Sequence, residues 1–99
     1  MSELQVHSLS AGVKFQGTLN RNTVPKVWRE RKTWMTTDKT FTADLENIDS
    51  VDSAGLAMLI QLKSELEQNK QELTLQGANE QLKAFAEMSG VTELLGLND

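Results

Sequence analysis

The sequence predicts one α/β domain over residues 1–99, with a mixed sheet of about four strands and helices mainly on one face. Its 99 residues are enough for one hydrophobic core. Some segments alternate apolar and polar residues, which is typical of strands. Between them lie segments whose apolar residues recur at helical spacing. The resulting order is β-β-α-β-α-β-α with a short terminal helix. Because strand–helix–strand units usually pair in parallel through right-handed crossovers, this order predicts the mixed sheet.

Two short strands are expected on either side of a turn at residues 11–12. Leu4 and Val6 alternate with polar residues before the turn, and Val13 and Phe15 do so after it. Such alternation is typical of strands that bury one face.

The first helix is expected to begin at Thr23, its N-cap, and to end near Met35. Pro25 lies in its first turn, where a missing N–H costs little. Arg31 falls among the apolar positions, so its charged end must reach back to solvent. One face of this helix carries Lys26, Arg29 and Lys32, and the apolar face carries Val24, Val27, Trp28 and Met35.

The remaining elements follow the same periodicity rules. The expected order is a strand at 41–45, a loop at 46–52, a helix at 53–68 and a strand at 72–77. Asn79 is expected to cap a further helix that ends before Gly90. The segment 91–97 is expected to add one helical turn, packed by Val91, Leu94 and Leu95.

Composition excludes several functions. The formal net charge of −4 argues against a nucleic-acid partner, because phosphate contacts need a net basic face. The chain has no cysteine and one histidine, His7, which excludes disulfides, thiol catalysis and histidine-rich metal sites. No apolar stretch approaches the roughly 20 residues that span a bilayer, and Met1-Ser2-Glu3 does not begin a signal peptide. We therefore expect a soluble cytosolic protein without direct membrane insertion.

Common enzyme motifs are missing from the sequence. It contains neither a G-x-x-x-x-G-K-[ST] phosphate loop nor a G-x-S-x-G nucleophile elbow. The acidic segment 44–52 lacks the glycine and the final glutamate of a calcium loop. Phe15 and Phe41 are expected in the core rather than around a ligand cavity. We expect no catalytic residue, no metal and no cofactor.

The helix after Asp52 has an unusual polar side. A helix face that only meets water normally carries Lys and Glu. This face is uncharged, and charged residues are depleted at the centres of protein interfaces. It favours docking of another protein, although a neutral surface of this size can also arise by chance. Its residues are Ser53, Ala57, Gln61, Ser64 and Gln68.

Asp52 and Ser53 stand at the start of that helix. Asp52 is expected to cap the helix, where its charge is favoured by the helix dipole. Ser53 is placed where a phosphate would meet free backbone N–H groups, so it is chemically suited to accept a phosphoryl group. The alternative is that both residues serve only as a helix start.

Trp28 and Trp34 flank the basic face of the first helix. This face suits an anionic membrane surface or an acidic partner. The alternative is a solvated basic face with both tryptophans packed inward. A large ring beside a docking surface is often an interface anchor, so Trp28 is a candidate partner contact.

The stretch "DLENIDSVDSAGL" resembles the STAS domain family, which includes the bacterial anti-sigma factor antagonists. The family pattern is D-L-x-x-V-x-x-x-D-[ST]-x-G-L, and this chain differs from it by isoleucine in place of valine. The matching residues are Asp44, Leu45, Ile48, Asp52, Ser53, Gly55 and Leu56. The resemblance implies a STAS fold and places Ser53 at the position that sigma-regulating members phosphorylate.

Within that family the chain is most similar to the small subunits of Mla-type phospholipid ABC transporters, on the stretches "VPKVW" and "LTLQGANEQL". This resemblance implies a non-catalytic cytoplasmic subunit, held at the inner membrane by its complex, in a system that maintains outer-membrane lipid asymmetry. The implied partner is the ATPase subunit and, through it, the permease. The implied contact residues are Asp52, Ser53, Ala54, Gly55, Ala57, Gln61 and Trp28, the last matching a tryptophan of that subgroup.

One departure separates the chain from the sigma-regulating members. Those members commonly read G-E-L-D after the second strand, in a loop that faces the anti-sigma kinase, whereas this chain reads Gly17-Thr18-Leu19-Asn20. The loss of both acids favours the transporter reading. The alternative that stays open is an anti-sigma factor antagonist switched by phosphorylation of Ser53.

Overall fold

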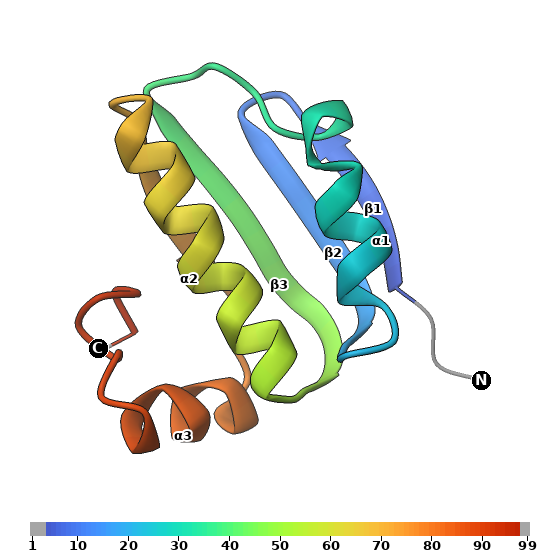
Figure 1. Ribbon diagram of the computed structural model, residues 1–99, viewed down its shortest axis with the longest axis vertical. Coiled ribbons are helices and arrows are strands. Elements are labelled where there is room, and N and C mark those ends of the chain that lie inside the picture. The colour runs from blue at the N-terminus through green and yellow to red at the C-terminus, as the bar shows by residue number, and fades with distance from the viewer. Residues whose placement is uncertain (1–3, 98–99) are drawn as a thin grey trace.

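The sheet has four strands in the order β1-β2-β3-β4 (Figure 1). The computed structural model describes residues 4–97, so the N-terminal Met1-Ser2-Glu3 considered above lies outside the described residues. β1 (Leu4–Leu9) and β2 (Gly12–Leu19) form an antiparallel hairpin. β3 (Thr40–Val51) pairs in parallel with β2 on one side and with β4 (Glu72–Gln76) on the other. This mixed four-stranded sheet confirms the predicted α/β fold.

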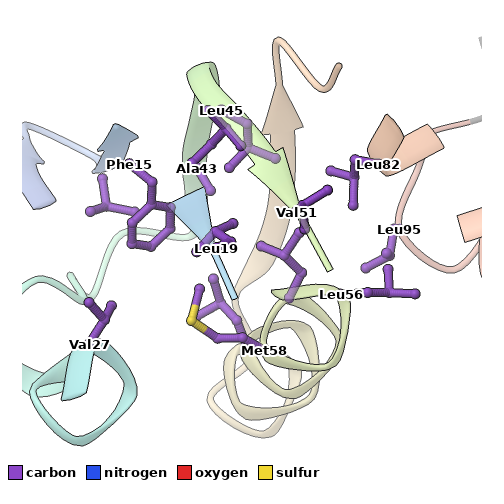
Figure 2. Close-up of a cluster of buried hydrophobic side chains, with 14 of the residues drawn as sticks. Phe15, Leu19, Val27, Ala43, Leu45, Val51, Leu56, Met58, Leu82 and Leu95 are labelled. Carbon is purple, nitrogen blue, oxygen red and sulfur yellow. The ribbon is translucent and has the colours of Figure 1, made fainter. Parts of the chain in front are cut away.

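The helices α1 (Val24–Arg29) and α2 (Ser53–Gln68) run across one face of this sheet, and α3 (Glu80–Met88) lies beyond the start of α2 (Figure 1). Strand and helix side chains meet between them, as Figure 2 shows for Phe15, Leu45 and Met58. In the first half of β3 alternate residues are buried under the helices, and the core contains both predicted phenylalanines, Phe15 and Phe41, with no exposed surface.

β3 is longer than predicted, because residues 46–51, expected in a loop, continue the strand. The pairing of β2 with β3 shifts register between Lys14 and Gln16 and again between Gly17 and Thr18. Such irregularities change which residues face the core. After Leu45, the next core residues are Ile48 and Val51. This spacing of three hides the alternation by which a strand is recognised.

α1 is shorter than predicted, since it ends at Arg29 and is followed by a 3₁₀ turn, η1 (Arg31–Thr33). The tighter turn brings Trp34 inward, where its ring meets Phe15 edge-on at 5.3 Å between centroids. Its Nε1 donates to the carbonyl oxygen of Val27 at 3.2 Å. Burial of this ring outweighs continuation of the helix.

Details at the start of α1 and at the C-terminal end refine the predictions. Thr23 is the N-cap residue of α1, as predicted, but its side chain makes no capping hydrogen bond, and its hydroxyl donates to the carbonyl oxygen of Thr18 at 2.7 Å instead. Residues 91–97 form hydrogen-bonded turns, and in one of them the Leu95 N–H donates to the Val91 carbonyl oxygen at 3.0 Å, the spacing of the expected single helical turn. Leu97 packs in the core beside Leu95, whereas Leu94, expected to pack, is 46% exposed.

α3 takes the place of a strand beside the second half of β3. Asn79 caps α3, as predicted, by accepting from the backbone N–H of Leu82 at 2.8 Å. Its Nδ2 donates to the carbonyl oxygen of Ile48 at 3.3 Å, and the Gln81 Oε1 accepts from the backbone N–H of Val51 at 2.8 Å. These side chains satisfy two backbone groups on the part of β3 that β4, paired only with residues 40–44, leaves open.

Candidate partner-binding site

Asp52 is the N-cap of α2, as predicted. Its Oδ1 accepts from the backbone N–H groups of Ala54 and Gly55 at 2.8 and 3.2 Å. Its Oδ2 accepts from the backbone N–H of Arg21 at 3.3 Å, which fastens the loop after β2 to the helix start. The carboxylate is therefore occupied by backbone donors within the chain.

Gly55 faces the interior rather than the surface. It is buried, and a Cβ at this position would lie 2.6 Å from the Val51 Cγ2 and 2.8 Å from the carbonyl oxygen of Leu19. No side chain fits at that distance without displacing the end of β2. The glycine thus lets α2 begin in direct contact with the sheet, and its part in any docking site is to set the position of its exposed neighbours.

The uncharged face of α2 predicted from the sequence is exposed in the structure. Ser53 is the first residue of the helix. All five members of the face are exposed, in contrast with the buried side formed mainly by leucines. The exposed residues are Ser53, Ala57, Gln61, Ser64 and Gln68.

A groove of about 280 Å³ runs between α1 and α2 beside Ser53. The α1 wall is formed by Val24, Pro25 and Trp28. The α2 wall is formed by Ala54, Ala57, Met58 and Gln61. None of these lining side chains carries a charge. Four of the residues predicted to contact a partner, Trp28, Ala54, Ala57 and Gln61, are thereby brought together on one hollow surface.

Trp28 is held in this groove by an arginine and a glutamate that the sequence did not single out as a pair. The Arg31 Cζ lies 4.5 Å from the centre of the Trp28 ring. The Arg31 Nε donates to both carboxylate oxygens of Glu65, at 3.0 and 2.9 Å. Arg31 and Glu65 are 34 residues apart, so no local pattern indicates this contact. It also explains how Arg31 is accommodated on the inner side of its segment.

The other residues of the basic segment have ordinary surroundings. Lys26, Arg29 and Lys32 are exposed. The two tryptophans differ, because Trp34 is packed inward with 3% of its surface exposed, whereas Trp28 is half-buried at the groove. Only Trp28 is therefore placed to meet a partner.

A larger hollow of about 470 Å³ lies at the opposite end of α2. Its lining includes the charged side chains of Lys32 and Glu65 together with Thr36, Asn69 and Gln71. The Gln71 Nε2 donates to the carbonyl oxygens of Thr36 and Asp38 at 2.8 and 2.7 Å, which ties the start of β4 to the loop before β3. Charged and polar side chains therefore make up most of the lining of this hollow, in contrast with the uncharged lining of the groove.

The acidic segment 44–52 lies along β3 and at the cap of α2. Among residues 4–97 no three potential ligand side chains from His, Cys, Asp or Glu gather in a group that could hold a metal ion. In the same residues no helix has the length and apolar character needed to cross a membrane.

A family model described as "Mlab, STAS domain" matches residues 3–96, almost the whole chain. The chain belongs to the STAS domain family. The family motif occupies the end of β3 and the start of α2, where Asp52, Ser53 and Gly55 have the distinct positions described above.

Relatives of this STAS domain carry the names of sigma-factor regulators. The anti-sigma-B factor antagonist of Staphylococcus aureus is 33% identical over 89 residues, which cover 88% of this chain and 82% of that protein. The unphosphorylated anti-sigma factor antagonist SpoIIAA has a similar fold, with a TM-score of 0.70 at 17% identity over 91% of this chain and 83% of that one.

A Mycobacterium paratuberculosis anti-sigma factor antagonist is similar in structure over 96% of this chain and 83% of its own. The TM-score is 0.72 at 13% identity. At such identities the two structures support the STAS fold alone, and none of these three proteins is named as an enzyme.

Proposed function

We propose that this STAS domain is a non-catalytic subunit that binds the ATPase of a Mla-type phospholipid ABC transporter and supports its assembly and activity. Through the ATPase it would associate with the permease, on the cytoplasmic side of the inner membrane. Its role in the cell would be to maintain outer-membrane lipid asymmetry.

The observation that carries this proposal is the uncharged groove between α1 and α2. Its walls place Trp28 opposite Ala54 and Ala57, and Ala54 directly follows the exposed Ser53 in the chain. A half-buried aromatic ring in a hollow of small side chains suits a protein contact, because interface centres are depleted of charge and anchored by aromatic residues. The description "Mlab" of the matching family model supports membership of the same subgroup.

The end of β2, bonded to the start of α2 through the Asp52 N–H and the Leu19 carbonyl oxygen, also supports a transporter role over a sigma-regulating one. Resemblance to the sigma-regulating members implies two acids here, and Thr18, within β2, and Asn20, just after it, stand at their positions. Thr18 is buried, and the Asn20 Oδ1 accepts from the backbone N–H groups of Asn22 and Thr23 at 2.8 and 3.0 Å. This segment therefore offers a kinase no carboxylate at these two positions.

The proposal is tested by affinity purification of the tagged protein from its native membranes, wild type beside Ser53→Glu. Glutamate in the first turn of a helix is compatible with folding, while its charge opposes a neutral contact. Thr74→Glu is the matched control, since Thr74 is exposed on β4 and alternates with the core-facing Leu73 and Leu75. We expect a P-loop ATPase and its permease with wild type and Thr74→Glu, and neither with Ser53→Glu.

A second candidate function is an anti-sigma factor antagonist switched by phosphorylation of Ser53. It is favoured by the exposure of Ser53 at the start of α2 and by the names of the relatives. A phosphate there would add charge to a neutral surface and release the partner. Recovery of a kinase-like anti-sigma factor in the purification, with Ser53 phosphate detected by mass spectrometry, would replace the transporter proposal with this one.

A further inference from the structure

Trp28 stands next to the end of a short helix, so its own element provides little to hold the indole. α1 has six residues and ends at Arg29, and the following residue, Glu30, has already left helical geometry with ψ of 13°. A side chain near a helix end has several rotamers open to it unless neighbours restrict them. The position of the groove wall therefore depends on contacts beyond α1.

Arg31 and Glu65 supply these contacts. The guanidinium lies over the Trp28 ring, with the Cζ 4.5 Å from its centre, and Nη1 donates to the Trp28 carbonyl oxygen at 3.1 Å. Glu65, on α2, accepts from the Arg31 Nε through both carboxylate oxygens. The chain of contacts from α2 through Glu65 and Arg31 to Trp28 spans the two helices that bound the groove.

We propose that Arg31 and Glu65 are positioning residues, which fix the Trp28 indole as a wall of the groove and so set the groove width before a partner arrives. The planar guanidinium suits this task, because it stacks on an aromatic face and bonds a carboxylate at the same time. A lysine at this position keeps the charge, but it has no planar group that can stack on the ring and bond both carboxylate oxygens at the same time. Only the consequence for affinity rests on the proposed function. The positioning of Trp28 is a property of the free protein.

The first experiment measures the free protein by NMR, using the indole Nε1–H signals of its two tryptophans, assigned with Trp28→Phe. Arg31→Lys and Glu65→Gln are expected to shift or broaden the Trp28 signal. Trp34 serves as an internal reference, because it is buried and bonded to Val27. Glu67→Gln is the matched control, since it removes an equal charge from α2 and breaks the 3.0 Å pair with Lys63 instead.

The second experiment measures the affinity of the same variants for the purified ATPase that wild type retains. Arg31→Lys and Glu65→Gln are expected to weaken binding about fivefold, the effect of losing one partly exposed cation–π contact and its ion pair. Glu67→Gln is expected to bind as wild type does. Urea unfolding of each variant separates a positioning effect from a general loss of stability.

The outcomes distinguish this inference from the proposed function. Unchanged Trp28 signals in both Arg31→Lys and Glu65→Gln would overturn the inference, whatever the partner. Altered Trp28 signals with unchanged affinity for an ATPase that wild type binds would overturn the link to docking and leave the proposed function intact. Failure of wild type to bind any ATPase would reject the proposed function, and the NMR result would still decide whether Arg31 and Glu65 position Trp28.

Discussion

The helices α2 and α3 are both packed on the core, but their outer surfaces differ. Across its first three turns α2 exposes only Ser53, Ala57, Gln61 and Ser64, none of them charged. The outer surface of α3 exposes two glutamates in nine residues, Glu80 and Glu87. A helix surface that meets only water normally carries charged residues, as the outer surface of α3 does. This difference supports the proposal that the start of α2, rather than α3, binds the partner.

The largest difference between the two helices is expected in partner affinity, when one negative charge is added to the outer surface of each. Ala57→Glu on α2 and Ala84→Glu on α3 are the same change at exposed helical positions. We expect Ala57→Glu to weaken ATPase binding by about 2 kcal/mol, because it desolvates a charge inside the neutral groove. Ala84→Glu should leave the affinity unchanged. Calorimetric titration measures both, and equal affinities would remove the distinction between the helices.

Glycine replacements compare the start of α2 with the end of α3. Gly55→Ala brings a Cβ within 3 Å of Val51 and Leu19, whereas a Cβ at Gly90 has open space but a φ of +71°. We expect a loss of unfolding free energy of about 2 kcal/mol for Gly55→Ala and about 1 kcal/mol for Gly90→Ala. Urea denaturation tests the ranking, and the reverse order would show that α2 does not depend on close contact with β2.

The two N-caps give a smaller contrast. Asp52 accepts from three backbone N–H groups, including that of Arg21, whereas the Asn79 Oδ1 accepts from one and its Nδ2 donates to Ile48. We expect Asp52→Ala to lower the unfolding free energy by about 1.5 kcal/mol and Asn79→Ala by about 1 kcal/mol. Thermal denaturation of the two variants checks this order. A larger loss of unfolding free energy for Asn79→Ala than for Asp52→Ala would show that the N-cap of α3 contributes more to stability.

The smallest contrast concerns ion pairs. Glu65 is bonded to Arg31 at 2.9 Å with side chains 31% and 27% exposed, whereas Glu80 lies 3.9 Å from Lys83 and is almost fully exposed. We expect Glu65→Gln to lower the unfolding free energy by about 0.5 kcal/mol. Glu80→Gln should have no measurable effect. A set of denaturation curves at low salt resolves the difference, and equal curves would assign Glu65 no more than a surface role.

Much of α2 could be predicted because its determinants are local. The cap at Asp52, the leucine side and the neutral side all follow from residues within one helix. The position of Gly90 after α3, with its positive φ, follows in the same way. The groove was predictable in part, since Trp28 and Ala57 were singled out from different arguments and then proved to line one surface.

The errors arise where distant residues decide the local structure. The length of β3 depends on register shifts against β2, which change the spacing of core residues to Leu45, Ile48 and Val51. The end of α1 depends on burial of Trp34 against Phe15. In both cases the deciding contact comes from residues far away in the sequence, so the local spacing of apolar residues does not reveal it.

The most direct test of partner binding at the groove between α1 and α2 follows the alanine methyl groups by NMR while the purified ATPase is added. We expect the Ala54 and Ala57 methyl signals to shift or broaden, because these residues line the groove, while Ala84 on the exposed surface of α3 keeps its signal. Changes at Ala84 with none at Ala54 and Ala57 would show that the partner binds α3 and not the groove.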